Sequence, residues 1–141
     1  MVKLMLPLEE KRIFYVEDNV SNLALVQMIL EQQGAKVYFE RWGDETDLIS
    51  RLQSCMPINL ILLDLMFAGN TNGYDLFDNI RQIPDFNLIP IAMLSAADPS
   101  IEMPKARAKG FTGYISKPVK LTLFPQQVAD LINGQHVWYA G

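Results

Sequence analysis

Four short apolar runs in this chain each end in a polar residue, and that residue differs in kind from run to run. They are Ile13–Val16 before Glu17 and Asp18, Leu60–Leu63 before Asp64, Ile91–Leu94 before Ser95, and Tyr114–Ser116 before Lys117. Continuous apolar runs separated by helix-like stretches are typical of buried parallel strands. Because an open parallel sheet collects polar groups at the carboxyl ends of its strands, we expect these side chains around one pocket. Three carboxylates, a hydroxyl and an ammonium group suit a divalent cation and a phosphoryl group.

Between these runs the chain alternates strands and helices in a β-α order repeated five times. Strands are expected at 12–16, 35–40, 58–65, 91–94 and 112–116, and helices at about 20–33, 45–54, 74–82, from near 104 to 110, and 124–132. This alternation predicts an α/β fold with a doubly wound, five-stranded parallel sheet and helices on both faces. We interpret residues 1–141 as a single domain with its core at about 11–132 and a short C-terminal tail at 133–141.

Composition narrows the classes of function. Half of the 141 residues are hydrophobic and a fifth are charged, which is ordinary for a globular domain. The net charge of −4 and the scattered basic residues give no general attraction to nucleic acid or to an anionic membrane. No apolar run approaches the ~18 residues that a membrane span needs, and the single Cys55 cannot form an internal disulfide. We therefore expect a cytoplasmic protein without direct nucleic-acid or membrane partners.

Three segments carry further expectations. Only Gln27 interrupts the apolar stretch from Leu23 to Leu30, so the first helix should be largely covered. Proline breaks a helix interior but is tolerated in the first turn, so the helix after Ser95 should be short and begin near Pro104. The residues 137–139 of the tail either pack back on the domain or contact a partner.

The polar strand ends, read together, resemble the receiver domain of two-component response regulators over about 11–132. The matching pieces are Val16-Glu17-Asp18-Asn19, Leu62-Leu63-Asp64-Leu65-Met66, Leu94-Ser95-Ala96 and Tyr114-Ile115-Ser116-Lys117-Pro118. Each piece alone is a weak signal, but all four occur in order and at the strand ends that the fold requires. The resemblance is to a stand-alone, CheY-like receiver and implies a flavodoxin-like (βα)5 fold.

The resemblance also implies residue roles. Asp64 would be the phosphoacceptor, Lys117 would pair with Asp64 before phosphorylation and with a phosphoryl oxygen afterwards, and Ser95 would donate its hydroxyl. Tyr114 matches the aromatic switch position that turns inward as the Ser95 hydroxyl moves, although a plain core tyrosine remains an alternative. The peptide bond between Lys117 and Pro118 is usually cis in this family.

Mg²⁺ is the cofactor that the resemblance implies. Glu17, Asp18 and Asp64 would bind it together with the backbone carbonyl of Met66. Mg²⁺ takes oxygen ligands and keeps several waters, so two or three carboxylates suffice. Solvated acids at a helix start are the alternative for Glu17 and Asp18.

The chain departs from the family pattern in two places. The loop 66–73 after Asp64 is about one residue longer than usual and lacks the family's proline. Met66 and Ala97 occupy the positions that face the attacking water, and because both are apolar we expect slow autodephosphorylation. Pro99 and Pro104 lie in the helix that carries the output surface, so a shortened helix would alter partner choice.

These observations predict a response regulator receiver in a two-component phosphorelay. A sensor histidine kinase or a histidine phosphotransfer protein would donate the phosphoryl group, and a downstream protein would bind the face formed by the last two helices and strand 112–116. A homodimer would use that same face. The chain is not expected to be an enzyme beyond its own phosphorylation and dephosphorylation, because an aspartyl phosphatase needs a second acid at the position of Met66. The alternative is a receiver-like protein-binding module that works without phosphorylation.

Overall fold

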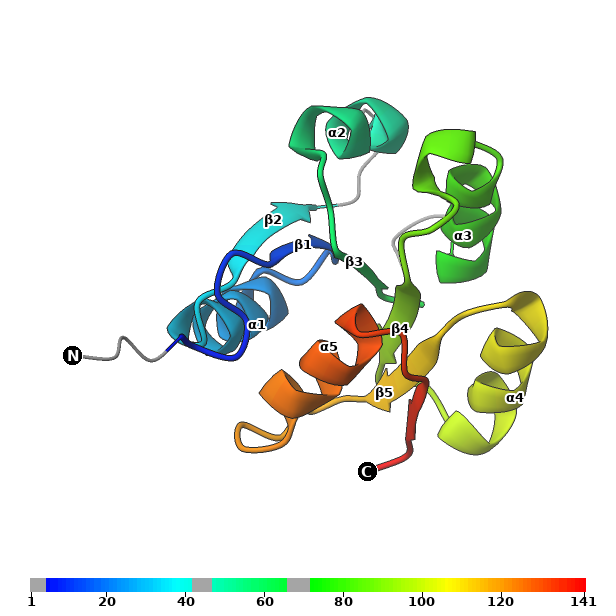
Figure 1. Cartoon of the computed structure of the whole chain (residues 1–141). Coiled ribbons are helices and arrows are strands. Elements are labelled where there is room, and N and C mark those ends of the chain that lie inside the picture. Colours follow the sequence, from blue (N-terminus) through cyan, green and yellow to red (C-terminus); the bar gives the residue numbers. More distant parts are fainter. Residues whose placement is uncertain (1–4, 42–46, 66–71) are drawn as a thin grey trace.

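The computed structural model describes residues 5–41, 47–65 and 72–141, and one parallel sheet forms its centre. The strands lie in the order β2-β1-β3-β4-β5-β6, and each neighbouring pair is parallel (Figure 1). They are β1 Arg12–Val16, β2 Lys36–Glu40, β3 Leu60–Leu63, β4 Ile91–Ser95, β5 Gly113–Ser116 and β6 Val137–Tyr139. The predicted α/β fold with five parallel strands is confirmed, and β6 extends the sheet by one strand.

Helices cover both faces of the sheet. Over the described ranges they are α1 Val20–Gln32, α2 Leu48–Cys55, α3 Gly73–Arg81, α4 Pro99–Lys109 and α5 Phe124–Ile132, with one short 3-10 turn at Pro84–Phe86. α1 and α5 lie on one face, and α2, α3 and α4 lie on the other (Figure 1). Each face has its own core because successive strand residues point to opposite sides, so Phe14 packs in one core and Tyr15 in the other. This coverage on both faces explains the continuous apolar runs.

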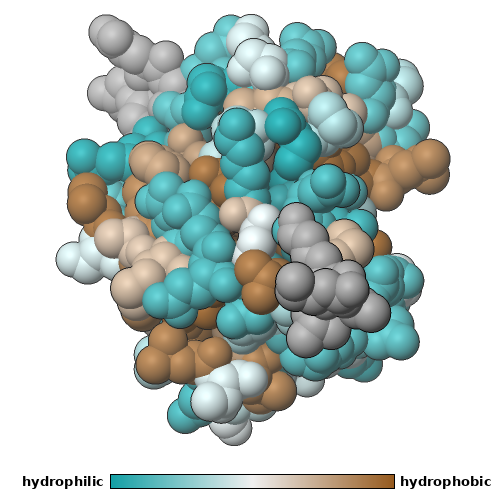
Figure 2. Space-filling model, turned by 60° about the vertical axis from the view of Figure 1, so that its left-hand side comes forward, coloured by the Kyte–Doolittle hydropathy of each residue, from teal (hydrophilic) through white to brown (hydrophobic). Residues whose placement is uncertain are grey.

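The surface is mixed in character. On the face shown in Figure 2, hydrophobic residues lie in small groups between hydrophilic ones. Within the described ranges, no helix combines the length and the apolar character needed to cross a bilayer.

Short polar signals determine where the helices near the strand ends begin and stop. Asn19 accepts a hydrogen bond from the Asn22 N–H (3.0 Å) and caps α1 directly after the acidic pair. Asn72 and Asp75 form a reciprocal capping box at the start of α3. α4 ends at Gly110, whose φ of 111° is readily adopted only by glycine.

α4 overturns one prediction. It runs unbroken from Pro99 across Pro104 to Lys109, so the expected late start near Pro104 is wrong. Pro99 is the first residue of the helix, where a missing N–H costs nothing. Pro104 lacks the N–H that would bond the carbonyl of Ser100, but both residues are exposed, so water can bind that carbonyl. Packing of the buried Ala106 against the core then holds the second half of the helix in place.

α1 is less covered than its sequence suggests. Its buried residues are Leu23, Val26, Ile29 and Leu30. Val20, Leu25 and Met28 are 54%, 38% and 49% exposed, so the prediction of a largely covered helix is wrong. The reason is geometric, because only residues three or four positions apart share a helix face, and a continuous apolar run therefore reaches the outer face as well.

The C-terminal tail packs back on the domain. β6 adds to the sheet parallel to β5, with Trp138 beside Tyr114. All three residues of β6 are half-buried. Of the two roles that the sequence left open for this tail, the structure shows packing.

Candidate functional site

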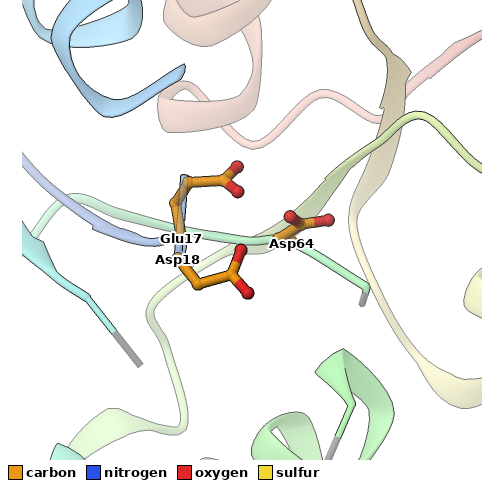
Figure 3. A group of neighbouring side chains, drawn as sticks. All are labelled: Glu17, Asp18 and Asp64. Atoms are coloured by element: carbon orange, nitrogen blue, oxygen red, sulfur yellow. The ribbon is translucent and has the colours of Figure 1, made fainter. Parts of the chain in front are cut away.

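Three acidic side chains meet at the carboxyl ends of β1 and β3, as the sequence predicts. Glu17 and Asp18 follow β1, and Asp64 follows β3, its neighbour in the sheet. One carboxylate oxygen of each lies within 4.8 Å of the others, and Figure 3 shows the three carboxylates around one space. Glu17 is only 1% exposed and Asp64 only 7%. Because burying a carboxylate without a partner is costly, this cluster requires compensating cations.

Lys117 provides one compensating charge from the end of β5. Its Nζ donates a hydrogen bond to Glu17 Oε2 and another to Asp64 Oδ2, 3.2 Å away. The peptide bond between Lys117 and Pro118 is cis, as the family resemblance predicts. The pairing with Asp64 was expected, whereas the bond to Glu17 was not.

Ser95 ends β4 and is linked to Tyr114 through the following loop. Ser95 Oγ accepts a hydrogen bond from the Ala97 N–H (3.0 Å), and the Ser95 carbonyl accepts one from the Lys117 N–H (2.8 Å). Tyr114 is fully buried, and its hydroxyl donates to the Ala97 carbonyl (3.0 Å). Ala97 therefore bonds to both the predicted phosphoryl-binding hydroxyl and the predicted switch residue.

These side chains surround an open cavity of about 530 Å³. Its lining comprises Glu17, Asp18, Asn19, Asn22, Asp64, Ser95, Ala96, Ala97 and Lys117. Every lining residue comes from a strand end, the loop after it or the first turn of α1. Ala96, whose side chain is a single methyl group, lines the cavity next to Ser95.

The carboxylates of the site differ in acidity. Burial and the neighbouring Glu17 raise the pKa of Asp64 from 3.8 to about 6, although Lys117 opposes the shift. Burial would also raise the pKa of Glu17, but hydrogen bonds with Asp64, Lys117 and Tyr15 lower it below the ordinary value. Two buried carboxylates thus share one lysine, and among the described residues the acidic groups of the cluster outnumber the cation that is bonded to them.

Sequence reasoning missed two residues of this site. Tyr15 is buried in β1 and its hydroxyl donates to Glu17 Oε2 (2.5 Å); burial raises its pKa, so it stays protonated as a donor. In an extended chain, residues two positions apart point to the same side, so a tyrosine two positions before the acid that follows the strand is the signal that could have revealed it. At Gly73, a Cβ atom would lie 2.3 Å from the Asp64 carbonyl oxygen, so only glycine lets α3 begin against Asp64.

The acidic cluster fits a hard divalent cation such as Mg²⁺. Carboxylate oxygens are the ligands that Mg²⁺ prefers, and Glu17, Asp18 and Asp64 offer one each within a small space. The excess negative charge of the cluster would be relieved by such an ion. The fourth predicted ligand, the carbonyl of Met66, lies outside the described residues. The arrangement is that of a candidate metal site that includes the predicted phosphoacceptor Asp64.

Comparison with known sequences points to one family. Residues 13–129 match the model of the response regulator receiver domain. The phosphate regulon transcriptional regulatory protein PhoB of Rhizobium meliloti is 35% identical over 107 residues, which cover 76% of this chain and 45% of PhoB. The two-component response regulator ARR17 of Arabidopsis thaliana is 25% identical over 134 residues, which cover 89% of this chain and 87% of ARR17. The chain thus spans less than half the length of PhoB but most of ARR17.

Solved structures agree with this assignment at the level of the fold. The chemotaxis protein CheY4 of Vibrio cholerae superposes with a TM-score of 0.75 at 20% identity, covering 86% of this chain and 98% of that one. The signal receiver domain of a histidine kinase from Syntrophus aciditrophicus gives 0.72 at 26% identity, covering 88% and 91%.

Proposed function

The chain belongs to the response regulator receiver domains of two-component systems, and we propose that it accepts a phosphoryl group on Asp64 from a phosphohistidine. The observation that carries this proposal is the bonding of Lys117 to both Glu17 and Asp64 inside an acidic cluster. A nucleophilic carboxylate, oxygen ligands for a cation and an ammonium group for a phosphoryl oxygen thereby lie together. We further propose that the chain acts in the cytoplasm and catalyses only its own phosphorylation and dephosphorylation.

In the proposed reaction, an Asp64 oxygen attacks the phosphorus atom of the donor. The P–N bond breaks, a P–O bond to Asp64 forms, and the imidazole leaves with the electron pair of the broken bond. Mg²⁺ held by Glu17, Asp18 and Asp64 would supply charge neutralisation for the transferring oxygens. Lys117 Nζ, 3.2 Å from Asp64, binds one phosphoryl oxygen, and the Ser95 hydroxyl donates to another.

The signal leaves the site through the loop after β4. Phosphorylation adds nearly two negative charges and three acceptor oxygens, which attract the Ser95 hydroxyl. When Ser95 Oγ turns toward the phosphoryl group, it releases the Ala97 N–H, and the Ala97 carbonyl is the group that binds Tyr114. The surface of α4, β5 and α5, here called the signalling face, then has two packings of differing affinity for a downstream protein.

The phosphodonor docks on α1, next to the site. Val20, Leu25 and Met28 give this helix an exposed apolar side, and Leu25 shares a small cleft with the segment 117–119. A sensor histidine kinase or a histidine phosphotransfer protein that packs there brings its phosphohistidine within reach of Asp64. An apolar patch of this kind, beside a polar site, is typical of a protein interface.

Chemical phosphorylation tests the proposal. The chain is incubated with acetyl phosphate and Mg²⁺, and its intact mass is measured. We expect a gain of one phosphoryl group that requires Mg²⁺ and is absent from Asp64→Asn. Asp78→Asn is the matched control, because Asp78 is an exposed acid of α3 that is bonded to Lys109 (2.9 Å) and does not line the cavity; it should be labelled like the wild type.

Either of two outcomes overturns the proposal. A folded chain that gains no phosphoryl group would be a receiver-like binding module that works without phosphorylation. A gain that persists in Asp64→Asn would place the acceptor on another residue.

A further inference from the structure

β6 occupies the edge of β5, in the middle of the signalling face. The two strands pair in parallel with Trp138 beside Tyr114, and the Val137 N–H donates to the Thr112 carbonyl (3.2 Å). An edge strand presents unpaired N–H and C=O groups that attract another strand. In this chain β6 takes up those groups of β5, so a segment of the chain itself fills the centre of the face.

The side chains of β6 contact both layers of the fold. Trp138 packs on the core that contains Tyr114, and the Arg107 guanidinium of α4 lies 4.5 Å from the centroid of its ring. Val137 and Tyr139 pack on the opposite core, which includes α5. This alternation follows from the pleat of a strand. β6 therefore joins the three elements that form the signalling face.

β5 is shaped to receive an extended segment at close range. A Cβ atom on Gly113 would lie 2.6 Å from the Val137 carbonyl oxygen and 2.8 Å from Leu131 Cδ2. The absence of a Cβ atom at this position is what leaves room for both β6 and α5. The edge therefore accepts a strand without rearrangement of its neighbours.

β6 is attached to β5 by a short ladder of hydrogen bonds, and a groove lies next to it. β6 is three residues long, follows the exposed residues 133–136, and makes only the few ladder bonds that such a length allows. A groove of about 610 Å³ lies between α4 and Ala140, the residue after β6, and its lining includes Met103 and Pro104. A longer extended segment would gain contacts in that groove that β6 does not make.

We propose that the edge of β5 is a binding site for an extended, aromatic segment of a partner protein, and that β6 is its intramolecular occupant. This inference rests on the proposed role of the signalling face in binding a downstream protein. The partner segment lies parallel to β5, places an aromatic ring where Trp138 contacts Arg107, and continues into the groove beside α4. A second copy related by a two-fold axis would bring β5 antiparallel to its own copy, whereas this edge fits a parallel strand.

Opening the edge tests the inference. Val137→Pro removes the N–H that bonds the Thr112 carbonyl, so β6 should detach. The probe is a synthetic peptide with the sequence of residues 134–141, titrated into the full ¹⁵N-labelled chain without Mg²⁺ or phosphodonor. A tethered strand competes at an effective concentration on the order of millimolar, so the wild type should bind the peptide weakly. We expect an affinity at least about tenfold higher for Val137→Pro, with amide shifts confined to β5 and the elements beside it.

The controls separate pairing at this edge from other effects. Ala140→Pro introduces the same residue just after β6, at an exposed position, and should behave like the wild type. A peptide carrying Trp138→Asp should not bind. If circular dichroism shows that Val137→Pro is unfolded, Trp138→Ala, which keeps the backbone N–H groups, is used with the same expectation.

Equal affinity of the peptide for the wild type and the opened variant would overturn the inference, as would shifts away from β5. Dimerisation of the opened variant in light scattering, without peptide binding, would also overturn it and assign the edge to a second copy. The titration needs no phosphorylation, so its failure leaves Asp64 as the proposed phosphoacceptor. Conversely, a failure of phosphorylation leaves the titration result standing.

Discussion

Replacing Asp64 by asparagine should stabilise the protein in the absence of divalent cations. The folded environment raises the pKa of Asp64 from 3.8 to about 6, chiefly through burial and then through Glu17. Each pKa unit corresponds to about 1.4 kcal/mol, so ionising Asp64 at neutral pH costs the folded state on the order of 3 kcal/mol. Asparagine has nearly the shape of the neutral acid and carries no charge. For a chain of this length, a gain of that size corresponds to roughly 10 °C in Tm.

Because the pKa of Asp64 is raised in the folded state, the stability difference between the wild type and Asp64→Asn depends on pH. Between the unfolded pKa near 3.8 and the folded pKa of about 6, the folded state holds a proton that the unfolded state has lost. Raising the pH through this window therefore lowers the stability of the wild type, and the penalty is complete above about pH 6. Asp64→Asn lacks this titration. The advantage of the variant should be full at pH 7.5 and should largely disappear near pH 4.

The assay is urea unfolding of both proteins in EDTA at pH 7.5 and at pH 4, followed by a Mg²⁺ titration at pH 7.5. Mg²⁺ should stabilise the wild type more than Asp64→Asn, because the stability that a folded-state ligand adds rises with the logarithm of its affinity. Asp78→Asn, which alters an exposed ion pair, should change stability by less than about 1 kcal/mol. A variant less stable than the wild type in EDTA at pH 7.5, or an advantage that persists unchanged at pH 4, would refute the reasoning.

Three further predictions concern residues around the site and α4. Tyr15→Phe removes the 2.5 Å hydrogen bond to Glu17 and should weaken Mg²⁺ binding roughly tenfold, measured by calorimetry. In a Glu17→Asp background the shorter carboxylate side chain should not reach the Tyr15 hydroxyl, so Tyr15→Phe should then have no effect on Mg²⁺ affinity. Pro104→Ala restores a helical N–H and should raise the free energy of unfolding by about 1–2 kcal/mol in urea; a loss of stability would contradict the account of α4 given above. With the apolar Ala97 beside the site, the phosphorylated chain should keep its phosphoryl group for minutes or longer in a mass-spectrometric time course, and loss within seconds would contradict this.

Much of the fold could be predicted because local signals and tertiary structure agree. Each buried strand is marked in the sequence by an apolar run, and the residue that follows or ends it supplies a polar group of the site: Glu17, Asp64, Ser95 or Lys117. The prediction failed where packing outweighed a local rule. At Pro104 the helix continues because solvent accepts the freed carbonyl and the buried Ala106 holds the following turn against the core, neither of which a single sequence displays.

The site was predicted less completely than the fold, for a geometric reason. Which residues follow a strand can be read along the chain, but which of them touch depends on side-chain length and direction. Glu17 is one methylene longer than aspartate, and this length lets it reach both Lys117 and the Tyr15 hydroxyl. The need for glycine at Gly73 likewise appears only when α3 is seen against the Asp64 carbonyl.

Ser95, which lines the same cavity as the proposed phosphoacceptor Asp64, is joined to the edge of β5 by a series of contacts. Ser95 bonds to the Ala97 N–H, the Ala97 carbonyl bonds to Tyr114, and Tyr114 pairs with Trp138 of β6. A change at Asp64 that alters the first of these contacts therefore changes the free energy of holding β6. Linkage is reciprocal, so if phosphorylation changes the free energy of holding β6, a segment that replaces β6 would change the free energy of phosphorylation by the same amount. We therefore expect a segment that binds at the edge of β5 to change how readily Asp64 accepts a phosphoryl group.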